Sequence, residues 1–203
     1  MSVYVQDLLN VHALYAARNM SLSFAALAGS AEFVENAHYP KNDVVDVQNG
    51  TRFFYHAHPA HERIDAEHGH FHIFVDAPAK PANAQPKFVH LAGISLDDKG
   101  TPLRLFTTNQ WVTGERYVRA EKLVDALASF QLSTLGRMAP IARWVNAMMR
   151  WCSDDIYQLL LQRDARLQSH QQGFREALRD RRWHILSQQR LSYWNRLSKE
   201  TSI

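Results

Sequence analysis

The chain has 203 residues, of which 46% are hydrophobic and 21% charged, and its formal net charge is +3 with the 11 histidines counted as neutral. This length and composition fit one globular domain with a buried core and exclude a disordered chain. The small positive charge does not require a nucleic-acid partner, and we expect none. The single cysteine, Cys152, cannot form an intrachain disulfide and is expected to be a buried structural thiol.

Residues 1–30 are predicted to be helical, because apolar residues recur at helical spacing from about Val5 to Leu27 without a proline or glycine between them. The first residues lack the basic and apolar regions of a signal peptide. No run reaches the roughly 18 apolar residues of a membrane span. These observations predict a soluble, cytoplasmic protein with no membrane partner.

The character of the sequence changes after the turn signal Asn49-Gly50. Four segments between residues 51 and 112 are rich in aromatic and β-branched residues and are bounded by turn residues, which predicts an antiparallel sheet of about four strands. A loop rich in proline and alanine, residues 76–86, separates the second and third strands. It is interpreted as a surface loop, with a functional lid as the alternative.

Helical patterns return from Thr113 and continue to about residue 200, the last of them as one or two amphipathic helices. The order of helix, antiparallel sheet and helices predicts an α+β fold with an N-terminal helix and a C-terminal helical region. We expect one domain over residues 1–203. The basic side chains of the C-terminal helices are interpreted as solvated helix faces.

The most informative segment is "HAHPAHERIDAEHGHFH", residues 56–72, which holds six of the 11 histidines. An even spread would place about one histidine there. Alternate residues of a strand share a face, so His56 and His58 should point one way on the first strand. His68, His70 and His72 should do so on the second. The connection is too short for a crossover helix, so the two strands should be antiparallel neighbours.

A hairpin symmetric about residue 63 would place His56 opposite His70 and His58 opposite His68, so that five imidazoles share one patch. Crowded imidazoles repel when protonated, whereas a divalent metal binds neutral rings directly. Glu62 and Glu67 are nearby carboxylates. The sequence therefore predicts a divalent-metal site for iron, zinc or copper, with metal-free histidine catalysis and a structural polar network as alternatives.

The block resembles the cupin metal motif, since Gly50, His56, His58, Glu62 and Gly69 have its spacing. That resemblance implies a metal site with His56, His58 and Glu62 as ligands. The second half of the cupin pattern is missing, because residues 93–112 contain no histidine.

The segment "HGHFHIF" is similar to the histidine-triad motif of nucleotide hydrolases and transferases, apart from Gly69 at an apolar position. This resemblance would make His70 a nucleophile toward phosphate. The lead-in "ERIDAE" differs from the glycine-rich lead-in of that family.

A third resemblance covers most of the chain and rests on "HYPKNDVVDV", "FFYHAHP", "EHGHFHIFV", "GISLDDKGTPLRLFTTNQWVTGE" and "RDARL". These segments resemble an uncharacterised bacterial domain-of-unknown-function family. That family implies no activity, but the comparison favours Glu67 over Glu62 as a ligand. The resulting ligand set is His56, His58, Glu67, His68, His70 and His72.

Other candidates are weaker. Asn109 and Trp111 could line a pocket beside the metal, and Arg104 could bind an acidic substrate, although most strand arginines are exposed.

The leading hypothesis is a metalloprotein with a small-molecule substrate, either a metal-dependent oxygenase or a hydrolase. The alternative is a non-catalytic metal or haem carrier or sensor. Neither the catalytic residues nor the oligomeric state follow from the sequence.

Overall fold

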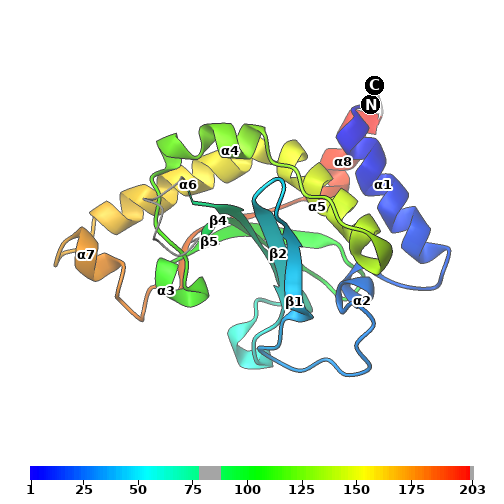
Figure 1. Ribbon diagram of the computed structural model, residues 1–203, viewed down its shortest axis with the longest axis horizontal. Helices are drawn as coiled ribbons and strands as arrows, with labels where there is room; N and C mark the ends of the chain where they lie inside the picture. The colour runs from blue at the N-terminus through cyan, green and yellow to red at the C-terminus, as the bar shows by residue number, and fades with distance from the viewer. Residues whose placement is uncertain (78–87, 202–203) are drawn as a thin grey trace.

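A six-stranded antiparallel sheet with helices over one of its faces forms the body of the molecule (Figure 1). The computed structural model describes residues 1–77 and 88–201, so the predicted proline- and alanine-rich loop lies almost entirely outside the described residues. The predicted α+β class is confirmed. In chain order the strands are β1 (Tyr39–Asp46), β2 (Thr51–His56), β3 (Gly69–Asp76), β4 (Phe88–Leu96), β5 (Pro102–Thr108) and β6 (Ile185–Arg190).

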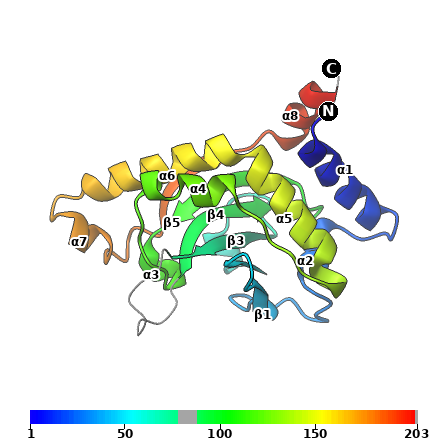
Figure 2. The same ribbon diagram turned by 45° about the horizontal axis from the view of Figure 1, so that its top comes forward.

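The α-helices are α1 (Val3–Ala16), α2 (Leu22–Ala26), α3 (Gln110–Thr113), α4 (Val124–Ala128), α5 (Ala139–Trp151), α6 (Ser153–Gln168), α7 (Phe174–Ala177) and α8 (Tyr193–Thr201). Three 3₁₀ turns are η1 (Ala60–Glu62), η2 (Ala120–Lys122) and η3 (Gly136–Met138). Figure 2 shows α4, α5 and α6 on one side of the sheet, with α1 beside α5. None of the helices in the described ranges is both long and apolar enough to cross a bilayer.

The two faces of the sheet differ sharply in chemistry. The helix face carries apolar pairs such as Phe53 with Ile73 and Tyr55 with Phe71, and Phe71 packs on Trp144 of α5. Burial of these side chains against the helices supplies the main driving force for the fold. The opposite face, called the histidine face below, carries the other residues of each strand: Arg52, Phe54 and His56 of β2, His70, His72 and Phe74 of β3, and their neighbours on β4 and β5.

The four strands predicted between residues 51 and 112 are β2 to β5, and β1 and β6 extend the sheet at its two edges. Residues 39–46, which form β1, lie before the segments for which the sequence predicts strands. The pairing of β1 with β2 is interrupted between Tyr39 and Val44, and Asp43 there has a φ of 54°. The polar β6 was assigned to a helix, since only its pairing with β5 shows that it is a strand.

The helix predicted from Thr113 is broken into short pieces by tertiary contacts. The buried Arg163 of α6 donates to the Val118 carbonyl, and the Asp164 carboxylate accepts from the Ala120 backbone N–H. These bonds hold residues 115–119 outside any helix, although Val118 remains buried. The N-terminal helical region is likewise divided, because Asn19 adopts a left-handed conformation (φ 51°) and Ser21 caps a new helix.

Candidate metal centre

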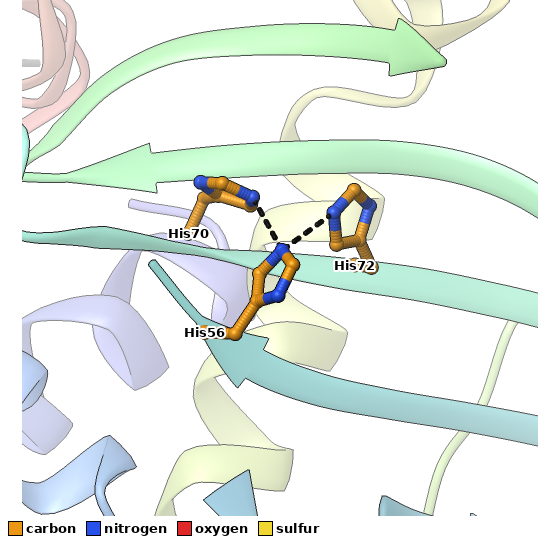
Figure 3. Close-up of side chains that lie close together, drawn as sticks. All are labelled: His56, His70 and His72. Carbon is orange, nitrogen blue, oxygen red and sulfur yellow. Dashed lines mark hydrogen bonds between the residues drawn. The ribbon is translucent and has the colours of Figure 1, made fainter. Parts of the chain in front are cut away.

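Three histidines of the predicted block converge on the histidine face (Figure 3). His56 ends β2 and pairs directly with His70 of β3, as the symmetric hairpin predicts. The Nε2 atom of His56 lies 2.8 Å from Nε2 of His70 and 3.2 Å from Nε2 of His72. One ligand atom from each ring lies within 4.8 Å of the other two. The three rings, called the triad below, could hold a metal ion.

Close approach of β2 and β3 depends on Gly69, the first residue of β3. A Cβ atom added at this position would lie 2.6 Å from the His56 carbonyl oxygen and 2.7 Å from the Tyr55 hydroxyl. Real Cβ atoms do not approach other heavy atoms so closely, so a side chain here would push the strands apart. The glycine inside the histidine block therefore has a packing role.

A carboxylate fixes the tautomer of His70 from behind. Nδ1 of His70 donates to Oε1 of the buried Glu67 at 2.6 Å, which leaves a lone pair on Nε2 facing the triad. Burial raises the pKa of Glu67, but the hydrogen bond from His70 and the charge of Arg104 outweigh it and hold the pKa below its usual value. Arg104 approaches Glu67 at 3.3 Å.

His72 has a second imidazole behind it. Its Nδ1 lies 2.9 Å from Nε2 of His90, whose Nδ1 lies 3.3 Å from the Thr108 hydroxyl. If His72 donates to His90 and His90 donates to Thr108, Nε2 of His72 also presents a lone pair to the triad. The backbone N–H of His90 donates to the carboxyl group of Glu115, whose pKa is raised to about 8 by burial.

His90 reaches this position through a register shift. Ile73 of β3 pairs with Ala92, but the next residue, Phe74, pairs with His90. Leu91 is thus left without a partner in the pairing, and the alternation of β4 is reversed beyond it. Without the shift, apolar residues of β4 would face His72.

His56 and His72 of the triad, and His90 behind His72, are held neutral by their lowered pKa values. Burial lowers the pKa of His56 to about 2, with further lowering from the neighbouring His70, His58 and His38. Burial also lowers the pKa of His72 well below its usual value and that of His90 to about 3. Neutral imidazole is the form that binds metal ions, so the environment prepares these rings as ligands.

The remaining residues of the predicted ligand set are placed differently. His58 lies at the margin, with its ring 4.8 Å from that of His56 and its Nδ1 3.1 Å from the Asn36 side chain. His68 precedes β3 and is turned away, because its Nδ1 lies 2.8 Å from the Tyr55 hydroxyl. Glu67 lies behind His70. The cupin-like spacing is not confirmed, and its Glu62 is half-exposed on η1.

Several contacts around the triad were not expected from the sequence. Arg104 is buried against Glu67, Ser95 and Gln188 instead of exposed. Thr108, on the face opposite to Thr107, approaches His90. Asn109 and Trp111 do not line this site, because their side chains donate to backbone carbonyls of residues 177 and 180. Cys152 is buried as expected, and burial raises the pKa of its thiol to about 12.

Comparison with protein families identifies the chain. Residues 3–191 match the domain of unknown function DUF6969. The chain belongs to the DUF6969 family. Searches of the curated proteins and of the solved structures find no match. The triad is the group of side chains in the described part of this DUF6969 domain that could hold a metal ion.

Proposed function

We propose that this DUF6969 domain is a zinc-dependent hydrolase whose ion is held by Nε2 of His56, His70 and His72. The observation that carries the proposal is the convergence of these atoms at 2.8 and 3.2 Å, with Glu67 behind one ring and His90 behind another. Ligands in a tetrahedral zinc site with Zn–N bonds of about 2.0–2.1 Å lie about 3.3 Å apart. The separation of 3.2 Å between His56 and His72 is close to that spacing, that of 2.8 Å between His56 and His70 is shorter, and all three ligand atoms lie within 4.8 Å of one another.

The numbers of hydrogen-bond donors and lone pairs on the three facing nitrogens support an ion at this point. Glu67 holds the ring proton of His70 outward. When His72 donates to His90, its proton is also directed outward, and two lone pairs then face His56. His56 can donate at most one proton from Nε2. One lone pair is then unsatisfied in a buried place, which is unfavourable. A cation satisfies all three nitrogens at once.

The donor set favours zinc and hydrolysis over iron and oxygen chemistry. Non-haem iron oxygenases bind their metal through two histidines and one carboxylate, whereas Glu67 is directed to the outer nitrogen of His70. Three neutral ligands leave the full charge of a divalent ion uncompensated. Zinc bound by three histidines lowers the pKa of a bound water to about 7 and so supplies a nucleophile for hydrolysis.

An open pocket distinguishes a catalytic site from a structural one. A pocket of about 180 Å³ is lined by His56 and His72 of the triad and by His58 and His38 at its margin. A structural zinc site has four protein ligands and is closed, whereas a catalytic site keeps one position for water or substrate. In the proposed site, the fourth coordination position of the ion faces the pocket and is open to water or substrate.

The first test is metal content by elemental mass spectrometry on protein that was never exposed to a nickel column. The wild type should hold about one zinc ion per chain, and the His56→Ala and His70→Ala variants should lose it. His68→Ala is the matched control within the block, because His68 faces Tyr55, and His61→Ala is an exposed control. Both controls should keep the zinc.

The absence of bound metal, with no uptake on reconstitution, would refute the proposal. Stoichiometric iron or copper would keep the centre but replace hydrolysis with redox chemistry. Cobalt-substituted protein tests the open position, since its visible spectrum should change when azide is added. A spectrum that azide leaves unchanged would indicate a closed, non-catalytic site.

A further inference from the structure

The pocket beside the triad runs along the histidine face toward one arginine. Arg52, Phe54 and His56 are alternate residues of β2 and therefore share this face. At about 3.4 Å per residue, the Cα atom of Arg52 is about 14 Å from that of His56. The pocket is lined by His56 and His72 of the triad and also by Arg52, so it connects the proposed metal position with a cation.

Aromatic rings form the wall between these two ends. Phe54 and Phe74 stack on each other with their centroids 5.6 Å apart, and Phe88 packs edge-on against Phe74 at 5.0 Å. All three rings line the pocket. The volume of about 180 Å³ is below the range of about 300–1,000 Å³ typical of drug-sized ligands. The pocket therefore suits a small molecule with an apolar body.

Arg52 is positioned to bind an anion. Its guanidinium lies over the Phe88 ring, 4.5 Å from the centroid, which holds it in place without using its hydrogen bonds. Its Nη2 atom is 3.7 Å from Asp76 Oδ1, beyond hydrogen-bond distance, and that carboxylate is half-exposed. Among the described residues no acceptor is hydrogen-bonded to this guanidinium. Arg104 differs, because Glu67, Ser95 and Gln188 occupy its donors.

The charge of the anion follows from the neighbouring acids. Asp43 lines the pocket and Asp76 lies beside Arg52. A doubly charged phosphate monoester would face both carboxylates with a single arginine to balance it. A carboxylate has one negative charge and two oxygens that match the fork of a guanidinium.

We infer that the substrate is a small monocarboxylate with an aromatic or similarly flat apolar body. Its carboxylate binds Arg52, its body lies against Phe54, Phe74 and Phe88, and its reacting group faces the triad. This inference rests on the proposed function for the role of the triad. The carboxylate subsite itself depends only on Arg52 and the aromatic wall.

The test uses 3-phenylpropanoate as the probe and 3-phenylpropanamide as its neutral counterpart, measured by calorimetric titration of zinc-loaded and metal-free protein. The carboxylate should bind at least tenfold more tightly than the amide. Arg52→Gln should abolish that preference, and Arg52→Lys should retain part of it. Arg143→Gln is the matched control, because Arg143 forms a similar 3.8 Å ion pair with Asp7 on the helical side.

Zinc content and thermal unfolding are measured on the same samples, so that a misfolded variant is recognised. Failure of the carboxylate to bind, equal binding of the amide, or full affinity in Arg52→Gln would overturn the inference. Binding that needs zinc and ignores Arg52 would place the carboxylate on the metal and would also overturn it. Arg52-dependent binding by a protein that takes up no metal would refute the hydrolase while supporting the carboxylate subsite.

Discussion

Glu67 Oε1 accepts a hydrogen bond from His70 Nδ1 at 2.6 Å, although the two residues lie on different parts of the hairpin, one before β3 and one inside it. This contact fixes which nitrogen of His70 faces the triad. The same carboxylate forms an ion pair with Arg104 of β5. The orientation of the His70 ring therefore depends on β3, on β5 and on the residue before β3 that carries the carboxylate.

Replacing this carboxylate should weaken zinc binding without removing a ligand. Glu67→Gln leaves the shape of the side chain but removes the charge that holds the His70 proton on Nδ1. The dissociation constant for zinc should rise about 10- to 100-fold, as measured by competition with a chromophoric chelator. Glu62→Gln, on the half-exposed η1 turn, should change it less than twofold. An equal effect of both substitutions would contradict the role assigned to Glu67.

Two adjacent threonines on opposite faces of β5 provide a second test. Thr108→Val removes the partner of His90 and should weaken zinc binding about three- to tenfold, less than the loss of a group that touches a ligand. Thr107→Val removes a buried hydroxyl 2.6 Å from Ser187, on the face of β5 opposite to Thr108. It should lower the free energy of unfolding by about 1–2 kcal/mol and leave zinc affinity unchanged. Reversed effects of the two variants would refute the contact between His90 and Thr108 as a support of the triad.

In the metal-free protein, His56 and His90 should lower stability in mild acid, whereas Glu115, whose pKa is raised to about 8, should add stability as pH falls. His56, with its pKa lowered to about 2, and His90, at about 3, stay neutral in the folded chain, whereas they titrate near 6.5 when unfolded. At these two histidines the unfolded chain therefore binds more protons below pH 6.5, and their contribution to stability falls as pH falls toward the folded-state values. Each such histidine should cost about 1.4 kcal/mol between pH 7.5 and 5.5.

Urea unfolding at the two pH values measures this loss in the presence of a chelator. His90→Gln should remove about 1.4 kcal/mol of the pH dependence, since glutamine does not titrate. Because Glu115 contributes with the opposite sign, the comparison of the variant with the wild type isolates His90. A His90→Gln variant with the same pH dependence as the wild type would show that His90 is protonated in the folded state.

Gly93 tests the packing around the triad. A Cβ atom at this position would lie 2.2 Å from the Phe106 ring, which packs edge-on against His70 and His72. Gly93→Ala should destabilise the protein by about 1–3 kcal/mol through overpacking, as measured by urea unfolding. Adding Phe106→Leu should restore part of the loss, because the smaller side chain leaves room for the methyl group. No gain in the double variant would show that the strain lies in the backbone instead.

The hairpin of β2 and β3 and the pairing of its strands could be predicted from the residue pattern alone. Alternation of apolar residues with histidines fixes the two faces, because a shift of one residue would expose Phe53, Tyr55 and Phe71 and bury the histidines in the helix face. The pairing of His56 with His70 follows from that constraint and from the length of the connection. The four central strands were predictable for the same reason, since each has a buried apolar side.

Which histidines meet, and which residues support them, depends on contacts between distant parts of the chain. His68 has the same spacing as His70 and His72, yet it precedes β3 and its Nδ1 lies 2.8 Å from the Tyr55 hydroxyl. Strand alternation holds only inside the paired segment, so it does not place this ring with the other two. The register shift in β4 places His90 behind His72, and pairing across the sheet brings Arg104 to Glu67. These contacts join residues 18 and 37 positions apart, beyond the reach of any local pattern. Local periodicity identifies the face of a strand, whereas the partners on that face depend on long-range pairing and packing.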